Sequence, residues 1–284
     1  MLNKTNRSEK LSPGKLNMSG QRRKSDLWRT YWDEMARQNT ALDQVNRKLR
    51  DLKREERFLV GQLGITSGDD VLDVCCGNGL ISLKVAEQCS KVVGIDLSEE
   101  MIARARVLSR RSRGSNCDFQ VASATSVPLA PNSMDLAYCL TSFHYFPGYS
   151  YAKQVIHEVL RVVKPGGAFL ITEVPDSDSW AHTMWQIIRN PKGEDAFDTL
   201  KTKASRSSVE RLKKRVQLLF RRITGKKVAS DSWTWYSRKE VRKMARTYSD
   251  SPCDVDIWPA HTRSRLASYR FDALVYKLQP TDGS

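Results

Sequence analysis

Val71-Leu72-Asp73-Val74-Cys75-Cys76-Gly77-Asn78-Gly79 is the part of this 284-residue chain that most narrows its architecture. Its first residues form a short, mostly apolar run that is typical of a buried strand. Gly77 and Gly79 predict a tight turn in which the backbone can approach a ligand closely, because glycine has no Cβ. Leu80–Gln88 then has a helical pattern. A strand, a glycine turn and a helix in this order predict the first unit of an open α/β sheet, whose ligands bind beyond the carboxyl ends of the strands.

Strands and helices continue to alternate after this first unit. Further strands are predicted at Lys91–Ile95, Asp118–Ala122, Asp135–Leu140, Ala168–Val174, Cys253–Trp258 and Arg270–Leu278, and helices begin at Ser98, Tyr151 and Ser237. Short apolar strands separated by helices are typical of a doubly wound parallel sheet. The last two strands are close enough in sequence to pair antiparallel. We therefore expect an α/β fold with a mostly parallel, Rossmann-like sheet of about seven strands, a C-terminal antiparallel hairpin and a helical insertion after the fifth strand.

Composition divides the chain into five segments. We expect a basic disordered tail over residues 1–25, an N-terminal helical cap over 26–64, a ligand-binding core over 65–175, a basic helical insertion or lid over 176–232 and the C-terminal part of the fold over 233–284. With 40% hydrophobic residues, the chain has enough apolar side chains for a sizeable core.

The net charge of +15 is concentrated in two appendages. Residues 1–24 carry a net charge of +6 and residues 201–227 one of +10, which leaves the remainder close to neutral. Within the second appendage, residues 207–224 have an apolar stripe between basic residues and predict an amphipathic helix. Such a helix fits an anionic membrane surface or another polyanion. The alternative is that the stripe packs on the protein body and the charges are only solvated.

Several classes of protein are excluded or disfavoured by composition. No stretch approaches the ~20 apolar residues of a membrane-spanning helix, and the mean hydropathy is -0.52. The first 24 residues have no apolar run that would make them a signal peptide. The six cysteines include no C-x-x-C, and no histidine has metal-ligand spacing to a partner, so we expect no metal site. We expect a cytoplasmic protein, peripheral to a membrane if the basic helix binds lipid.

Residues around the glycine turn indicate which nucleotide-like ligand the sheet binds. Asp96 ends the second strand, where a carboxylate accepts hydrogen bonds from ribose hydroxyls. A dinucleotide-binding turn has a third glycine, whereas this chain has Ser82 there. Asp73 lies four residues before Gly77, where an acid disfavours a pyrophosphate and suits an amino group. These features favour S-adenosylmethionine (SAM), which has a sulfonium and an ammonium but no phosphate, over a dinucleotide.

The chain resembles the class I SAM-dependent methyltransferases, in particular the broad methyltransferase-domain subgroup that includes the quinone C-methyltransferases. The motifs that carry the resemblance are Val71–Gly79, Val93–Ser98, Ala122–Ala124 with Val127–Leu129 and Ser133–Asp135, Ser142–Phe146 and Glu158–Gly167. The resemblance covers about residues 55–175, with weaker support at 237–278. The resemblance implies an enzyme that transfers a methyl group from SAM, and it leaves the acceptor open.

The resemblance also implies a set of cofactor-binding residues. They are Asp73, Cys75, Gly77, Gly79, Asp96, Leu97, Met101, Ser123, Ala124 and Leu140. Two positions depart from the family pattern. Ser123 replaces the acidic residue that usually contacts the adenine amine, so we expect its hydroxyl or the backbone to meet the adenine. Cys75 and Cys76 replace small residues of the first motif, and we expect buried, inert thiols rather than redox-active ones.

His144 and Tyr145 are the candidate catalytic residues, because they follow the fourth strand at the ligand-binding edge. Histidine titrates near neutral pH and can act as a general base toward an acceptor hydroxyl. A structural histidine is the alternative, and Tyr145 is expected to orient the substrate or to pack. All seven tryptophans lie outside residues 33–179. We expect these flanking aromatics to line an acceptor pocket or to form the core of a lid.

The leading interpretation is a SAM-dependent methyltransferase that acts on a small-molecule, glycan or lipid-linked acceptor, at oxygen or carbon. An enzyme that holds RNA or protein with its basic segments is the alternative. Nucleic acid is disfavoured, because the neutral body shows no basic and aromatic stacking module. A non-catalytic binding module with the same fold is the second alternative, and the intact Gly77, Gly79 and Asp96 argue against it.

Overall fold

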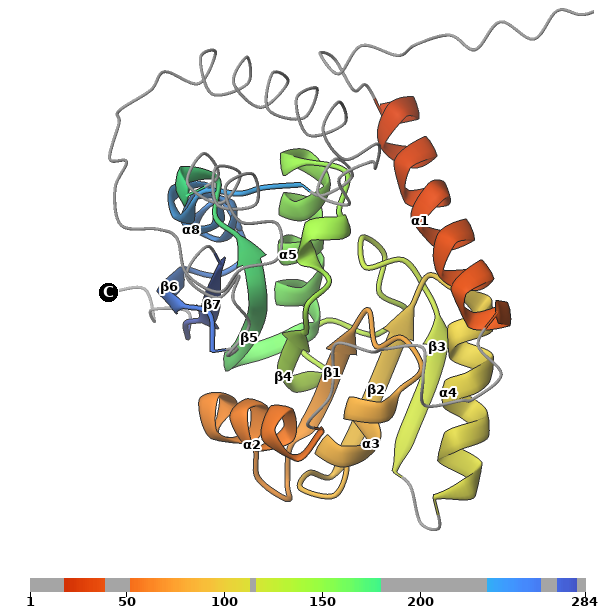
Figure 1. The fold of residues 1–284 in the computed structure, drawn as a ribbon. Helices are drawn as coiled ribbons and strands as arrows, with labels where there is room; N and C mark the ends of the chain where they lie inside the picture. The colour runs from red at the N-terminus through yellow and green to blue at the C-terminus, as the bar shows by residue number, and fades with distance from the viewer. Residues whose placement is uncertain (1–17, 39–51, 113–115, 180–233, 262–269, 280–284) are drawn as a thin grey trace, which may run out of the picture.

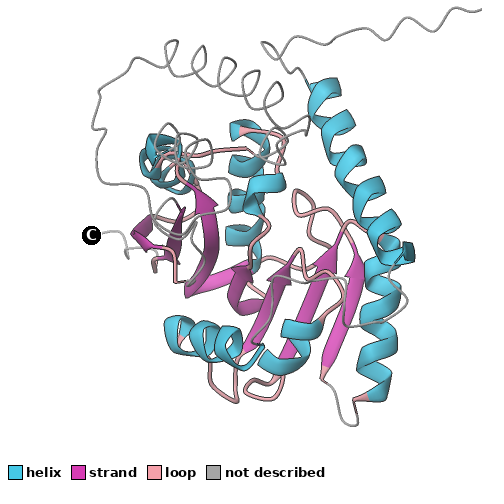
Figure 2. Ribbon diagram, viewed as in Figure 1, coloured by secondary structure: helices cyan, strands magenta, loops and turns pink. Residues whose placement is uncertain are grey.

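The fold is built on one seven-stranded sheet in the described part of the chain (Figures 1 and 2). The computed structural model describes residues 18–38, 52–112, 116–179, 234–261 and 270–279. The strands are β1 (Asp70–Val74), β2 (Lys91–Asp96), β3 (Cys117–Val121), β4 (Met134–Cys139), β5 (Val163–Pro175), β6 (Cys253–Pro259) and β7 (Arg270–Lys277). Their order is β3-β2-β1-β4-β5-β7-β6, and only the pairs made by β7 are antiparallel. The predicted parallel sheet with a C-terminal antiparallel hairpin is confirmed.

Strand β5 begins earlier than the sequence predicts. Residues 165–167, which precede the predicted strand Ala168–Val174 and in which we expected a turn, lie inside β5 as a bulge. Val163 pairs with Met134 of β4, and the next pair joins Ala168 to Leu136. Gly166 within the bulge has a φ of 88°, a conformation that glycine adopts without steric cost. The glycines therefore make a kink in a continuous strand rather than the turn that precedes it.

Helices cover both faces of the sheet (Figure 2). They are α2 (Leu52–Leu63), α3 (Leu80–Val85), α4 (Glu99–Arg111), α5 (Tyr149–Val162) and α8 (Arg238–Arg246), with the 3-10 turns η1 (Phe143–Tyr145) and η2 (Ser177–Ser179). Successive residues of a strand point to opposite faces. Leu72 and Val74 of β1 therefore join the core under α5 and α8, whereas Val71 joins the core under α2 and α3.

Helix α1 (Met18–Gln38) starts before the position that the sequence predicts. The expected disordered tail extends to residue 25, but residues 18–25 are helical in the structure. This stretch contains glutamine, arginine and lysine, which are good helix formers, so its basic charge does not prevent a helix. The boundary expected at residues 64/65 follows the end of α2, and the one at 175/176 coincides with the end of β5. The boundary at 232/233 lies outside the described residues.

Helix α1 lies beside α4 at the edge of the sheet (Figure 1). Ala36 and Trp32 of α1 pack against Met101 of α4. Arg37 also pairs with Glu100, with 3.1 Å between guanidinium nitrogen and carboxylate oxygen. The N-terminal helix is thus attached to the part of the fold that follows the second strand.

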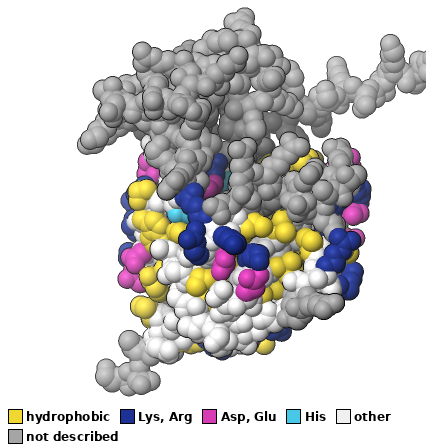
Figure 3. Space-filling model, turned by 60° about the horizontal axis from the view of Figure 1, so that its bottom comes forward, with side chains coloured by type: hydrophobic (Ala, Val, Ile, Leu, Met, Phe, Trp, Pro, Cys, Tyr) yellow, Lys and Arg dark blue, Asp and Glu magenta, His cyan; other side chains and the backbone are white. Residues whose placement is uncertain are grey.

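The expected basic amphipathic helix over residues 207–224 lies outside the described residues, and membrane or polyanion binding through residues 201–227 stays a prediction. No helix within the described ranges is both long and apolar enough to cross a bilayer. On the face shown in Figure 3, Lys and Arg side chains lie beside Asp and Glu side chains. Among the described residues visible on this face, neither charge forms an extended patch.

Candidate functional site

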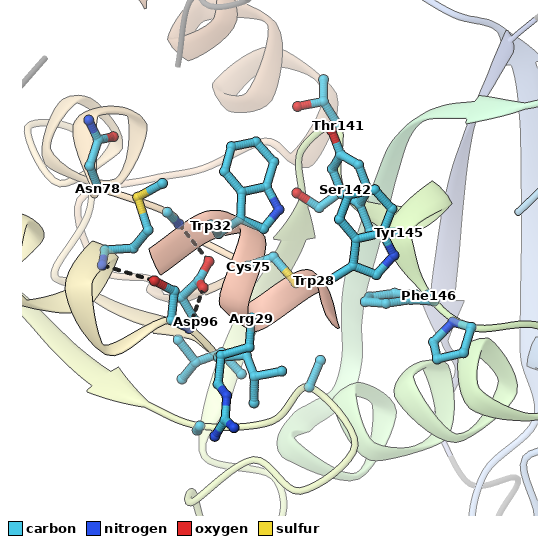
Figure 4. Close-up of a pocket in the computed structure, with 18 of the residues that line it drawn as sticks. Trp28, Arg29, Trp32, Cys75, Asn78, Asp96, Thr141, Ser142, Tyr145 and Phe146 are labelled. Carbon is cyan, nitrogen blue, oxygen red and sulfur yellow. Dashed lines mark hydrogen bonds between the residues drawn. The ribbon is translucent and has the colours of Figure 1, made fainter. Parts of the chain in front are cut away.

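A cavity that is partly open to solvent lies at the carboxyl ends of the central strands (Figure 4). Helix α1, the β1–α3 turn, the end of β2, the start of α4, the segment after β3 and the segment after β4 all contribute to its wall. The lining side chains are Trp28, Arg29, Trp32, Cys75, Gly77, Asn78, Ile95, Asp96, Leu97, Ser98, Met101, Ala122, Ala124, Thr141, Ser142, Tyr145, Phe146, Pro147 and Tyr151. The sheet edge predicted from the sequence to bind a ligand is the edge that carries this cavity.

Asp96 is held in place at the tip of β2 by backbone donors. The amide of Gly77 donates to Oδ2 at 2.9 Å, and the amide of Ser98 donates to Oδ1 at 2.9 Å. Burial raises the pKa of Asp96 from its ordinary value, while these hydrogen bonds lower it. Each carboxylate oxygen has a second acceptor site, so the group can still receive hydroxyl hydrogens from a ligand in the cavity.

The two glycines of the turn have different roles, one at the cavity and one in the core. Gly77 lines the cavity with a φ of 55°, and no atom lies within 4 Å of a Cβ built on it. Gly79 does not line the cavity. A Cβ on Gly79 would lie 2.6 Å from the ring of Phe119, so this glycine serves the packing of α3 against β3. The structure gives Gly79 a packing role, and its contact with the cofactor stays a prediction.

Asp73 is also absent from the cavity wall. Its carboxylate accepts hydrogen bonds from the Ser82 hydroxyl at 2.6 Å and the Tyr138 hydroxyl at 2.9 Å. Burial raises its pKa to about 7. Alternation along β1 places Asp73 on the same face as Val71, toward α3. Its role toward an amino group of the ligand stays a prediction.

An apolar part of the cavity lies next to Asp96. Leu97, Met101, Ala122 and Ala124 line it. Ser123 is not among the lining residues, but its hydroxyl lies 3.4 Å from that of Tyr151, which is one of them. Four expected cofactor residues therefore lie here or nearby (Asp96, Leu97, Met101 and Ala124), while Leu140 is buried and does not line the cavity.

Helix α1 forms part of the cavity wall, and Asp33 attaches this helix to the beginning of α4. The Asp33 carboxylate accepts hydrogen bonds from the Ser98 hydroxyl at 2.5 Å and the Glu100 amide at 3.4 Å. Ser98 is the N-cap of α4 and its hydroxyl also accepts from the Met101 amide. This contact places Trp28, Arg29 and Trp32 of α1 on the cavity wall.

Aromatic rings form the end of the cavity opposite Asp96 (Figure 4). We name Trp28, Trp32 and Tyr145 the aromatic wall. The ring of Tyr145 lies 4.5 Å from that of Trp28 and 5.6 Å from that of Trp32, centroid to centroid. Burial raises the pKa of Tyr145 to about 12, so its phenol stays protonated at neutral pH. Ser142 and Thr141 add hydroxyl groups beside the aromatic wall.

His144 lies behind the aromatic wall, not in the cavity. The side chain is fully buried, and its ring is tilted against that of Tyr145 with the centroids 4.1 Å apart. Its position in η1 turns it toward the core while Tyr145 faces the cavity. The structure therefore brings one of the two candidate catalytic residues into the site and places the other beneath it.

Sequence reasoning missed several lining residues. The concentration of tryptophan outside residues 33–179 indicated that flanking aromatics line a pocket, and Trp28 and Trp32 do so. Trp258 instead packs against the core under α2 and α3, and Trp180, Trp185 and Trp233 lie outside the described residues. Asn78, Thr141 and Tyr151 had no signal that separated them from ordinary turn or helix residues.

The residues of the cavity fit SAM. One continuous cavity contains the Asp96 carboxylate, which can accept hydrogen bonds from ribose hydroxyls, and an apolar part beside it. It also contains Gly77, where the backbone can approach a ligand closely. A dinucleotide would place its pyrophosphate at the turn before α3. That helix has only 6 residues, and the buried carboxyl of Asp73 lies beneath it, so the position disfavours a pyrophosphate. The predicted preference for SAM over a dinucleotide thus agrees with the geometry.

Known proteins support the same assignment. Residues 71–167 match a family model described as a methyltransferase domain. The chain is 31% identical over 147 residues to 27-O-demethylrifamycin SV methyltransferase of Amycolatopsis mediterranei, a match that covers 50% of this chain and 48% of that protein. It is 32% identical over 145 residues to a ubiquinone biosynthesis O-methyltransferase of Azoarcus sp., covering 51% and 57%. The chain thus spans about half the length of the curated relatives that it matches.

Solved structures show the same fold. The structure of magnesium protoporphyrin IX methyltransferase from Synechocystis PCC 6803 with bound S-adenosylhomocysteine superposes with a TM-score of 0.55. The superposition covers 89% of this chain and 100% of that one, at 14% identity, and therefore shows the fold alone. Fold, motifs and matches together define a class I methyltransferase domain of the SAM-dependent type. In this chain the matched part of that domain is residues 71–167.

Proposed function

We propose that this protein transfers a methyl group from SAM to a small molecule that carries an apolar, ring-containing group. The observation that supports the proposal best is the single cavity that joins Asp96 at one end to the aromatic wall at the other. Two relatives act, as their names state, on 27-O-demethylrifamycin SV and in ubiquinone biosynthesis. Oxygen or carbon is the proposed acceptor atom.

Each end of the cavity has its own task in this proposal. Asp96 accepts hydrogen bonds from the ribose, and the backbone at Gly77 allows the ligand to approach closely. Leu97, Met101 and Ala124 surround the adenine and keep water from it. SAM supplies the methyl group together with its leaving group, so the protein contributes mainly by orientation, which lowers barriers by ~7–11 kcal/mol in well-oriented reactions.

The aromatic wall binds the acceptor and excludes water. Tyr145, with its protonated phenol, donates a hydrogen bond to an acceptor oxygen rather than removing a proton from it. His144 does not reach the cavity, so it acts on the acceptor only through Tyr145, on which its ring packs. We therefore propose Tyr145 as the residue that orients the acceptor and His144 as its support.

Calorimetric titration with SAM tests the cofactor half. Asp96→Ala removes the ribose acceptor, and hydrogen bonds to a charged group contribute about 1.5–3 kcal/mol, so affinity should fall roughly 10- to 150-fold. Asp118→Ala is the matched control, since Asp118 is an exposed carboxylate on β3 that does not line the cavity. Equal SAM affinity in Asp96→Ala and the parent protein would contradict the assignment.

A transfer assay tests the catalytic half. The purified chain is incubated with SAM that carries a labelled methyl group and with a panel of phenolic, quinol, polycyclic and saccharide acceptors. Label should move to ring-containing acceptors, and Trp28→Ala should raise their KM. Tight SAM binding without label transfer to any acceptor would favour the non-catalytic binding module.

A further inference from the structure

Three strand tips at the ligand-binding edge adopt a backbone conformation that non-glycine residues rarely take. Within the described ranges, four non-glycine residues have positive φ angles, and one of them is Asn132 in a turn. The other three are Cys75 (62°), Thr141 (52°) and Glu173 (54°), at or near the ends of β1, β4 and β5. A Cβ carries a steric cost in this region that glycine avoids. Such outliers point to positions where the side chain itself is needed.

Of the three, Cys75 lies in the middle of the cavity. It lines the cavity, as Thr141 also does. Figure 4 shows the Cys75 sulfur between Asp96 on one side and Ser142 and Tyr145 on the other, below Trp32. A ligand that extends from Asp96 to the aromatic wall must therefore pass the Cys75 side chain. Glycine here would remove both the backbone strain and the Cβ and Sγ atoms.

Cys75 is not set up to react. The thiol packs against the larger core, which includes Cys139 at the end of the neighbouring strand β4. A hydrogen bond with Cys139 and burial together raise the pKa of Cys75 well above its ordinary value. Since the thiolate is the reactive form of cysteine, this thiol stays neutral and poorly nucleophilic. Its remaining contribution to the cavity is its volume.

We propose that the Cys75 side chain limits the size of the group at the middle of the bound ligand, so that the site accepts a methyl-bearing sulfonium and rejects longer S-alkyl groups. This inference rests on the proposed function, because it takes SAM as the ligand that reaches past Cys75. A site that is filled at this point discriminates by contact against one additional methylene, which changes affinity by about 10-fold or more. The strained backbone at Cys75 is retained because glycine would open that space.

Calorimetric titration of the full chain with SAM and with its S-ethyl analogue tests the proposal. The parent protein should bind the S-ethyl compound at least 10-fold more weakly than SAM. Cys75→Gly should reduce this ratio to about 3-fold or less, and Cys75→Ala, which keeps Cβ and loses Sγ, should give an intermediate ratio. Cys253→Ala is the matched control and should keep the parental ratio, because Cys253 lies on the edge strand β6 and does not line the cavity.

The outcomes separate this inference from the proposed function. A parent protein that binds neither compound would overturn the proposed function. Normal SAM binding with no discrimination against the S-ethyl compound would overturn the role of Cys75, as would an unchanged ratio in both Cys75 variants.

Discussion

His261 links α2 to the C-terminal hairpin through two carboxylates, and its replacement by glutamine should change how stability depends on pH. The His261 Nε2 lies 2.8 Å from a Glu55 oxygen, and Nδ1 lies 2.8 Å from an Asp272 oxygen. Phe58 stacks on the imidazole, with ring centroids 3.6 Å apart. The His261 side chain is only 7% exposed, so water screens these interactions weakly.

The magnitude follows from the pKa of His261. Hydrogen bonds and attraction to Asp272 and Glu55 outweigh the effect of burial, which alone would lower the pKa, and raise it to about 9 from an ordinary 6.5. A pKa unit corresponds to ~1.36 kcal/mol, so the ion cluster contributes about 3 kcal/mol to the free energy of unfolding. Because the folded-state pKa is the higher one, this contribution is complete below about pH 6.5 and is lost as the pH rises through about 9.

Urea unfolding at pH 6.5, 8 and 9.5 measures the effect. The difference in unfolding free energy between the parent protein and His261→Gln should shrink by about 3 kcal/mol from pH 6.5 to 9.5. Glu55→Gln is the control, because it removes one carboxylate and should shift the loss to lower pH without abolishing it. Parallel stability profiles for the parent and His261→Gln would refute the assignment of a charged imidazole at neutral pH.

Two further changes test the first motif. Gly79→Ala should destabilise the fold by about 2–4 kcal/mol, because it combines a left-handed φ of 75° with a Cβ 2.6 Å from Phe119. Gly61→Ala in α2 is the control, since nothing lies within 4 Å of a Cβ there. Similar urea midpoints for the two variants would contradict the packing role of Gly79. Asp73→Asn should gain stability relative to the parent protein as the pH rises from about 4 to 7, because the raised pKa of Asp73 makes its ionisation costly in the folded state. A stability difference that is independent of pH over this range would show that folding does not raise the pKa of Asp73.

The sequence carried enough information for the sheet and for the position of Asp96, because both depend on local patterns. Apolar runs between glycine turns determine where strands begin and end, and a carboxylate that follows a parallel strand comes to the ligand-binding edge in any sheet of this kind. The bulge in β5 was not predictable in the same way. It depends on pairing with β4, which joins residues far apart in the chain.

Side-chain direction was harder to predict than element type. Both faces of β1 are buried, so the residues around Asp73 are apolar whichever face they point to. The sequence therefore gives no sign that Asp73 faces α3. His144 and Tyr145 are adjacent in a 3-10 turn, and which of them faces the cavity depends on the helix α1 that packs against Tyr145. That packing in turn depends on the contact between Asp33 and Ser98, which are 65 residues apart.

Helix α1 is a wall shared by both ends of the cavity, and this has a thermodynamic consequence. Asp33 ties the helix to the loop that follows Asp96, while Trp28 and Trp32 contact Tyr145 at the other end. Two ligands bound beneath the same helix each restrict its motion. By linkage, the factor by which the first ligand changes the affinity for the second equals the factor by which the second changes the affinity for the first. Saturation with a nonreactive acceptor should therefore alter the dissociation constant of the cofactor, and α1 is the element that carries this reciprocity.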